Sequence, residues 1–284
     1  MPPAVGIVST ALRRPTTYTG LVREALSTAQ CIARYPFGLL DAALRTGRPS
    51  GERSLDTPVL LVHGFGHNRS GWMVLERRLR RAGFTSVHTW NYNPLRYDVP
   101  RLAQHLGRRV DLLRTLTGSE RVHVVGHSLG GVLLRWYVQE LGGGAAVGTA
   151  VTVASPHEGT ALARLARGGT MAQLAPGSRL MRHLATGAAP SPVRWIAYYS
   201  NLDLLVQPAS SAMLRAPGLL ATNILAKDEG HLSILLSPRV TASIVAQLLA
   251  EEGVGEMAPL AALATRDPLL GAEPGAPGDA AAAH

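Results

Sequence analysis

Ser128 lies in a segment whose residue types could perform nucleophilic chemistry. This segment, RVHVVGHSLGGVLLRWYVQEL, runs from Arg121 to Leu141, and it begins as a β-branched run and ends as an apolar helical pattern. Gly126 and Gly130 flank the serine because side chains at these two positions would collide with neighbouring backbone in a strained turn. A strand, a tight turn and a helix in this order predict a serine hydroxyl at the end of a sheet, where it could attack a carbonyl carbon.

A serine hydroxyl becomes a nucleophile when a base takes its proton and a third group fixes the tautomer of that base. In folds with this turn the chain order is serine, acid, histidine. His231 follows the last expected strand, on a loop before the final helix, and is therefore the predicted base. Three other histidines follow the serine and are less suitable. His284 is terminal, His183 lies in an expected insertion, and His157 is not preceded by an acid at a strand end.

Asp203 is the predicted acid. It follows an expected strand in WIAYYSNLDLLVQP and precedes a turn marked by proline, although an aspartate in such a place can also be a helix cap or turn residue. The other acids are less suitable. Glu140 lies on the helix that leaves the serine, and Glu158 lies just before the insertion. Asp228 and Glu229 lie too close to His231 in sequence to approach the far side of its ring.

Acyl transfer also needs donors for the oxyanion that forms on the attacked carbonyl. One predicted donor is the backbone N–H of Leu129, the residue after the nucleophile. The other is the backbone N–H of Phe65 in the sequence HGFG at 63–66, where glycines would let the backbone approach a substrate. The alternative for HGFG is an ordinary glycine turn.

The elements that must position these residues follow an alternating pattern of strands and helices from Thr57 onward. Such alternation with short links predicts an α/β fold with a mostly parallel, doubly wound sheet. The expected strands are 58–64, 87–92, a run from Val122, 149–154, 193–199 and 222–226, and the expected helices are 71–82, 99–116 and 238–249.

The chain divides into a helical leader at 1–55, a main domain at 56–252 and a tail at 253–284, which is rich in Ala, Pro and Gly and is expected to be disordered. Apolar residues of the leader fit two amphipathic helices, over Tyr18–Tyr35 and Pro36–Leu44. Three alternatives are open for this segment: it packs on the main domain, it lies on a membrane or a partner, or it is partly disordered. Its apolar residues are Leu21, Ala25, Ile32, Leu39 and Leu40. The segment 159–191 is expected to form a small helical cap over the substrate pocket, or else ordinary crossover helices.

Composition narrows the class of protein. The 284 residues are 46% hydrophobic and fit one large globular domain with appendages. Cys31 is the single cysteine, which excludes an intrachain disulfide and cysteine-built zinc sites. Neither a long apolar run nor a standard signal peptide is found, so a cytoplasmic or peripherally membrane-associated protein is expected, with secretion left as an alternative.

The net charge of +9 could favour anionic lipid surfaces, with contact through residues 1–55. Lys227 is the only lysine, however, so the arginine excess is better explained by genome composition. Aromatic residues make up 5% of the chain and do not alternate with basic clusters, which argues against nucleic-acid binding.

Five motifs together resemble the α/β-hydrolase superfamily, and within it the bacterial triacylglycerol lipases and esterases. The resemblance spans about residues 57–250, and its Asp and His segments are similar to those of small, minimal-lid lipases, although the segment 159–191 is larger than they carry. The motifs are HGFG at 63–66, GHSLGG at 126–131, SPHEGT at 155–160, YSNLDLLVQP at 199–208 and GHLSILLSP at 230–238.

The resemblance implies that Ser128, Asp203 and His231 are nucleophile, acid and base, and that Phe65 and Leu129 supply the oxyanion donors. It implies hydrolysis of carboxylic esters of lipid or acyl type through an acyl-enzyme, with no cofactor and no metal. Two alternatives use the same scaffold: an acyltransferase with the same triad, and a non-catalytic membrane-associated lipid-binding protein. The oligomeric state and the acyl chain are left open.

Overall fold

The computed structural model describes residues 15–39, 55, 57–187 and 191–254 of the chain. The expected tail from residue 255 onward and most of the expected second leader helix lie outside these residues. The remaining predicted elements can all be compared with the structure.

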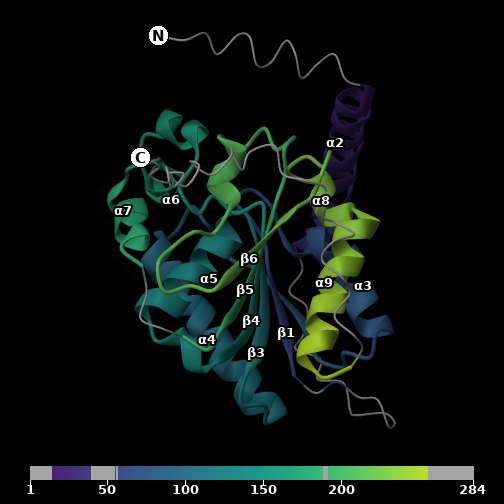
Figure 1. The fold of residues 1–284 in the computed structure, drawn as a ribbon, viewed down its shortest axis with the longest axis vertical. Coiled ribbons are helices and arrows are strands. Elements are labelled where there is room, and N and C mark those ends of the chain that lie inside the picture. The colour runs from purple at the N-terminus through teal and green to yellow at the C-terminus, as the bar shows by residue number, and fades with distance from the viewer. Residues whose placement is uncertain (1–14, 40–54, 56, 188–190, 255–284) are drawn as a thin grey trace, which may run out of the picture.

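A six-stranded sheet forms the centre of the molecule, and every neighbouring pair of its strands is parallel (Figure 1). The strand order is β2-β1-β3-β4-β5-β6, so the sheet begins with β1, adds β2 at one edge and then crosses back to add β3 to β6 on the other side of β1. This confirms the predicted parallel, doubly wound α/β fold. The strands are β1 (Val59–Val62), β2 (Val87–Trp90), β3 (Val122–His127), β4 (Val147–Val153), β5 (Arg194–Tyr199) and β6 (Ala221–Leu225).

Two hydrophobic cores lie on opposite faces of the sheet. Alternate residues of one strand enter different cores: Leu60 and Val62 pack with helices α4 and α5, whereas Val59 and Leu61 pack with α3 and α9. Both faces are covered, which explains why the strands have nearly continuous apolar sequences. Figure 1 shows these helix pairs on either side of the sheet. Their bounds are α3 (Met73–Arg81), α4 (Val99–Thr117), α5 (Leu129–Glu140) and α9 (Pro238–Glu251).

Helix ends follow local chemistry. Asp98 caps α4 because its side chain accepts a hydrogen bond from the Arg101 amide at 2.9 Å, and Gly118 ends the helix with a positive φ of 72°. The expected helix at 71–82 is shorter, because the 3-10 helix η2 (Arg69–Trp72) precedes α3. The short helix α8 (Ser233–Leu236), directly after His231, was not predicted.

The segment 159–191 contains three short helices between β4 and β5, namely η4 (Ala161–Leu165), α6 (Gly169–Gln173) and α7 (Arg179–Ala185). Two further 3-10 helices, η3 (Gly143–Ala145) and η5 (Ala209–Ala212), lie in connections. No described helix combines the length and the apolarity needed to cross a bilayer.

The leader contributes helix α2 (Pro15–Arg34) and the 3-10 helix η1 (Tyr35–Gly38). Among its expected apolar residues, Leu21 is half-buried, whereas Ile32 is 69% exposed and Leu39 is 62% exposed. Of the α2 side chains whose burial is described, the buried ones are the small residues Gly20, Ser27 and Cys31. Small side chains on this face let the helix approach the main domain closely, and Figure 1 shows it near α8.

His88 is a buried titratable residue of β2. Its Nε2 atom lies 2.8 Å from the Ser86 hydroxyl. Burial is the largest cause that lowers its pKa, from 6.5 to about 4, and nearby Arg109 and Arg80 act in the same direction. The ring therefore stays neutral in the folded protein at a pH where an unfolded chain is already protonated.

Replacing His88 with Gln should weaken the acid sensitivity of the fold. A histidine with a lowered folded pKa adds stability above pH 6.5, and this contribution is lost as the pH falls towards about 4. Urea unfolding at pH 7.0, 5.5 and 4.5 should show that His88→Gln loses less unfolding free energy over this range than the wild type. Parallel curves for the two proteins would contradict this prediction.

Candidate active site

Ser128 occupies a strained turn between β3 and α5. Its φ of 52° and ψ of −119° are rarely adopted by a residue with a side chain. Its amide donates to the Val153 carbonyl of the neighbouring strand at 2.9 Å, and this bond fixes the turn at the carboxyl end of the sheet. Leu129 begins α5. Because the first amides of a helix have no partner within the helix, this turn can receive a developing negative charge.

The glycines around Ser128 are required by close backbone contacts. A Cβ atom at Gly126 would lie 2.6 Å from the Gly131 nitrogen, and one at Gly130 would lie 2.3 Å from the Val62 carbonyl oxygen. In both cases the atom in the way is rigid backbone. The strand and the helix therefore meet at a distance that only glycine permits, as predicted from the spacing.

His231 and Asp203 are brought together across 28 residues of sequence. The His231 Nδ1 atom donates to the Asp203 Oδ2 atom at 2.7 Å, and both side chains are buried. An Nδ1–H directed at a carboxylate fixes the neutral tautomer in which Nε2 is free to accept a proton. This is the arrangement that a general base requires.

Asp203 is held by its own loop as well as by the histidine. Its Oδ1 atom accepts hydrogen bonds from the backbone amides of Leu205 and Val206, each at 2.8 Å. The carboxylate is only 1% exposed, so these donors replace the water that it would otherwise bind. The turn predicted around the proline thus positions the acid.

His127 joins the serine turn to the loop of His231. Its Nε2 atom donates to the His231 backbone carbonyl at 3.0 Å, and the two rings lie 4.7 Å apart. Burial, with the neighbouring His231 as a smaller cause, holds the pKa of His127 well below its ordinary value. No role for His127 was predicted from the sequence, although its place directly before Ser128 is a usable signal.

The loop at 63–66 lies against Ser128. A Cβ atom at Gly64 would lie 2.8 Å from the Ser128 Cβ atom, so no larger residue fits beside the serine. His63 fixes this loop, since its Nδ1 atom donates to the Gly64 carbonyl at 2.8 Å and its Nε2 atom accepts from the Tyr92 amide at 3.3 Å. Burial lowers the pKa of His63 to about 4, which keeps the ring neutral and both bonds intact. The Phe65 side chain is partly exposed.

The sequence of this chain matches a known family over most of its length. Residues 59–279 match the family described as the alpha/beta hydrolase family. The chain belongs to the alpha/beta hydrolase family. The match includes both expected oxyanion positions and the three candidate residues, and it leaves out the leader.

Solved structures share the fold of this alpha/beta hydrolase at low sequence identity. The mature form of a Bacillus licheniformis lipase is 17% identical and has a TM-score of 0.60, and the alignment covers 72% of this chain and 96% of that chain. Aspergillus fumigatus lipase B is 19% identical and has a TM-score of 0.61, and the alignment covers 79% of this chain and 59% of that chain. A Paleococcus ferrophilus monoacylglycerol lipase is 17% identical and has a TM-score of 0.51, and the alignment covers 69% of this chain and 96% of that chain. At this identity the comparisons establish the fold.

Three titratable residues that were not predicted as acid or base have other partners, namely His183, Glu140 and His157. His183 and Glu140 pair with each other at 2.7 Å between α7 and α5, away from Asp203. His157 lies 3.0 Å from the Thr152 hydroxyl, and burial keeps its pKa well below the ordinary value. His284 lies outside the described residues. Among the described residues, no three His, Cys, Asp or Glu side chains form a group that could hold a metal ion.

Arg135 ties the segment 159–191 to the main domain. Its guanidinium donates to the His157 carbonyl and to the Leu184 carbonyl, each at 2.7 Å, and the side chain is buried. Burial lowers the pKa of Arg135 to about 10, which leaves it charged at neutral pH. Helix α7 is therefore fastened to α5 by charge-assisted hydrogen bonds.

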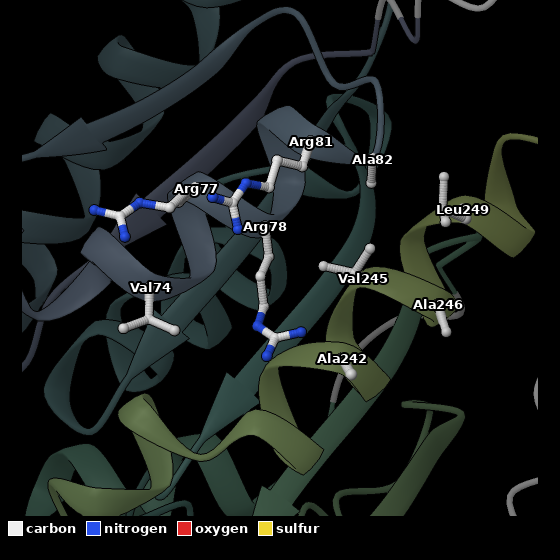
Figure 2. A pocket seen from close by; sticks show the side chains of 9 residues that line it. All are labelled: Val74, Arg77, Arg78, Arg81, Ala82, Ala242, Val245, Ala246 and Leu249. Atoms are coloured by element: carbon white, nitrogen blue, oxygen red, sulfur yellow. The ribbon is translucent and has the colours of Figure 1, made fainter.

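A groove of about 580 Å³ lies on the other face of the sheet, between α3 and α9 (Figure 2). Arg77, Arg78 and Arg81 of α3 border it, and apolar residues of α9 form its other side. None of the candidate site residues lines this groove, so it is distinct from the candidate active site.

Gly130→Ala should damage both the fold and the site. The added methyl group would meet the Val62 and His63 carbonyl oxygens, and overpacking against rigid backbone costs about 3 kcal/mol of unfolding free energy. Gly168→Ala is the matched control because a Cβ atom there meets nothing within 4 Å. Urea unfolding of both variants measures the difference, and equal stability would show that the turn tolerates a side chain.

Proposed function

We propose that this protein is a serine hydrolase that cleaves carboxylic esters of lipid or acyl type. The observation that carries the proposal is the 2.7 Å hydrogen bond between His231 and Asp203, on loops at the sheet end that also holds Ser128. Serine, acid and histidine occur in the chain order of alpha/beta hydrolases with this turn. Membership of the family supports the same chemistry.

The proposed reaction proceeds in two halves. Ser128 attacks the ester carbonyl while the Nε2 atom of His231 takes its proton, and Asp203 stabilises the imidazolium that forms. The amides of Phe65 and Leu129 donate to the oxyanion of the tetrahedral intermediate. His231 then protonates the leaving alcohol, and a water that it deprotonates releases the acid from the acyl-enzyme. These steps require no cofactor.

Exposed apolar side chains support an apolar acyl group as substrate. Phe65 is in the proposed oxyanion loop, and Leu204 and Leu205 directly follow the proposed acid; all three are partly or largely exposed. Leu162 and Leu165 add exposed apolar surface in the segment that we propose as a cap over the pocket. Burial of acyl methylene groups against such side chains would contribute to binding.

Ser128→Ala should lower kcat for p-nitrophenyl butyrate by about four to six orders of magnitude, because the reaction loses its nucleophile. Asp203→Asn should lower kcat about 10⁴-fold, because the tautomer of His231 is no longer fixed. Circular dichroism checks that both variants stay folded. Turnover that survives Ser128→Ala would overturn the proposal and favour a non-catalytic lipid-binding role for this scaffold.

Ester hydrolysis should depend on acyl length. Each methylene group buried in an apolar site contributes about 0.8 kcal/mol, so kcat/KM should rise roughly fourfold per carbon from acetate to butyrate. A series of p-nitrophenyl esters from acetyl to palmitoyl measures this, with the products analysed in the presence of competing alcohols. A best rate with acetate would contradict an apolar acyl pocket, and transfer of the acyl group to the alcohols in preference to water would identify an acyltransferase.

A further inference from the structure

Helix α2, which precedes the family match, lies against the loops that carry the acid and the base. A Cβ atom at Gly20 would lie 2.3 Å from the Leu202 side chain, one residue before Asp203, and 3.1 Å from the Asp228 carbonyl oxygen. A larger residue at Gly20 would have to displace the Leu202 side chain and would crowd the Asp228 carbonyl. The close approach therefore depends on the smallest side chain of α2.

Glu24, one turn further along α2, binds the backbone that follows His231 and lies close to Gly230 before it. Its Oε1 atom accepts from the Leu232 amide and its Oε2 atom from the Ser233 amide, each at 2.8 Å. On the other side of the histidine, a Cβ atom at Gly230 would lie 2.2 Å from the Glu24 Oε2 atom. The carboxylate thus fixes the loop of the base with two charge-assisted hydrogen bonds.

A second charged contact holds the same loop. Arg23 pairs at 3.2 Å with Glu229, whose carboxylate is 2% exposed and also lies 3.6 Å from Arg239. The hydroxyl of Ser200, after β5, donates to the Glu229 carbonyl. The residues before His231 are therefore fixed between α2, α9 and the loop of the acid.

The segment after α2 reaches the third loop of the site. The Tyr35 carbonyl accepts from the Asn68 side chain at 2.8 Å, and the Gly38 carbonyl accepts from the Asn91 side chain at 2.7 Å. Asn68 follows the loop at 63–66 by two residues and caps η2. Residues 15–38 therefore contact the loops of the acid and the base, and they bind Asn68 just after the proposed oxyanion loop.

We infer that residues 15–38 form a strap that completes the catalytic site, and that Glu24 is a positioning residue for His231. The inference rests on the proposed function, because it assigns Glu24 to the geometry of that same reaction. Without the carboxylate, the Leu232 and Ser233 amides lose their acceptor and the loop can shift. A displacement of about 1 Å at a catalytic group can lower a rate by up to about 10²-fold.

The test compares Glu24→Ala and Glu24→Gln with two controls in the full chain. Glu76→Gln removes a carboxylate from α3, where it pairs with Arg80, and Gln30→Ala changes an exposed residue of α2. Each protein is assayed with p-nitrophenyl butyrate for kcat and KM, and with a fluorophosphonate for the rate and the final extent of serine labelling. Hydrogen exchange of a peptide covering residues 229–236 reports directly on the loop.

Glu24→Ala should lower kcat and the labelling rate by about tenfold, leave KM within about twofold, and still reach complete labelling. The kcat and labelling rate of Glu24→Gln should lie between those of Glu24→Ala and the wild type, because glutamine keeps one acceptor oxygen. Both controls should have the kcat and labelling rate of the wild type. Exchange at 229–236 should accelerate only in the Glu24 variants. The labelling endpoint separates misplacement of the base from loss of folded protein.

Two outcomes overturn the inference, and they can be told apart from failure of the proposed function. Unchanged kcat and exchange in Glu24→Ala, with Ser128-dependent turnover in the wild type, would refute the strap alone. A fall in kcat matched by an equal fall in the labelling endpoint would show a purely structural role for Glu24. A wild type without Ser128-dependent turnover and labelling would refute the proposed function, and the inference with it.

Discussion

The close contact between the start of α5 and the end of β1 is the constraint on which the rest of the site depends. Gly130 lies so near the Val62 and His63 carbonyls that no side chain fits, and Gly126 meets the backbone of the same helix turn. This contact forces Ser128 into its strained conformation and directs the helix amides towards the sheet end. The same contact brings the loop at 63–66 beside the serine.

Asp203 and the loop of His231 are held from two directions. Within the main domain, two backbone amides and His231 occupy the oxygens of Asp203. From outside the family match, Glu24 occupies the amides that follow His231. Backbone amides shielded from water need acceptors, and Glu24 of the leader supplies them to the Leu232 and Ser233 amides.

Sequence reasoning could predict the parts of the fold that local patterns determine. Six apolar runs separated by helical patterns gave the six strands and the parallel sheet, because strands buried on both faces need continuous apolar residues. It missed α8, since four residues carry too little periodicity to register. The small buried residues of the leader helix were not predicted either, because apolarity was the signal used and packing there depends on small and polar residues.

The sequence by itself determined the serine turn, the order of the candidate residues and the glycine-rich loop, because glycine spacing and strand ends are local properties. Only the tertiary structure decided that Asp203 meets His231, and that His183 and Glu140 pair with each other instead. It alone brought Glu24 to the Leu232 amide beside His231, 208 residues away in the chain. Contacts over such separations depend on how helices pack against the sheet, and no local pattern records that packing.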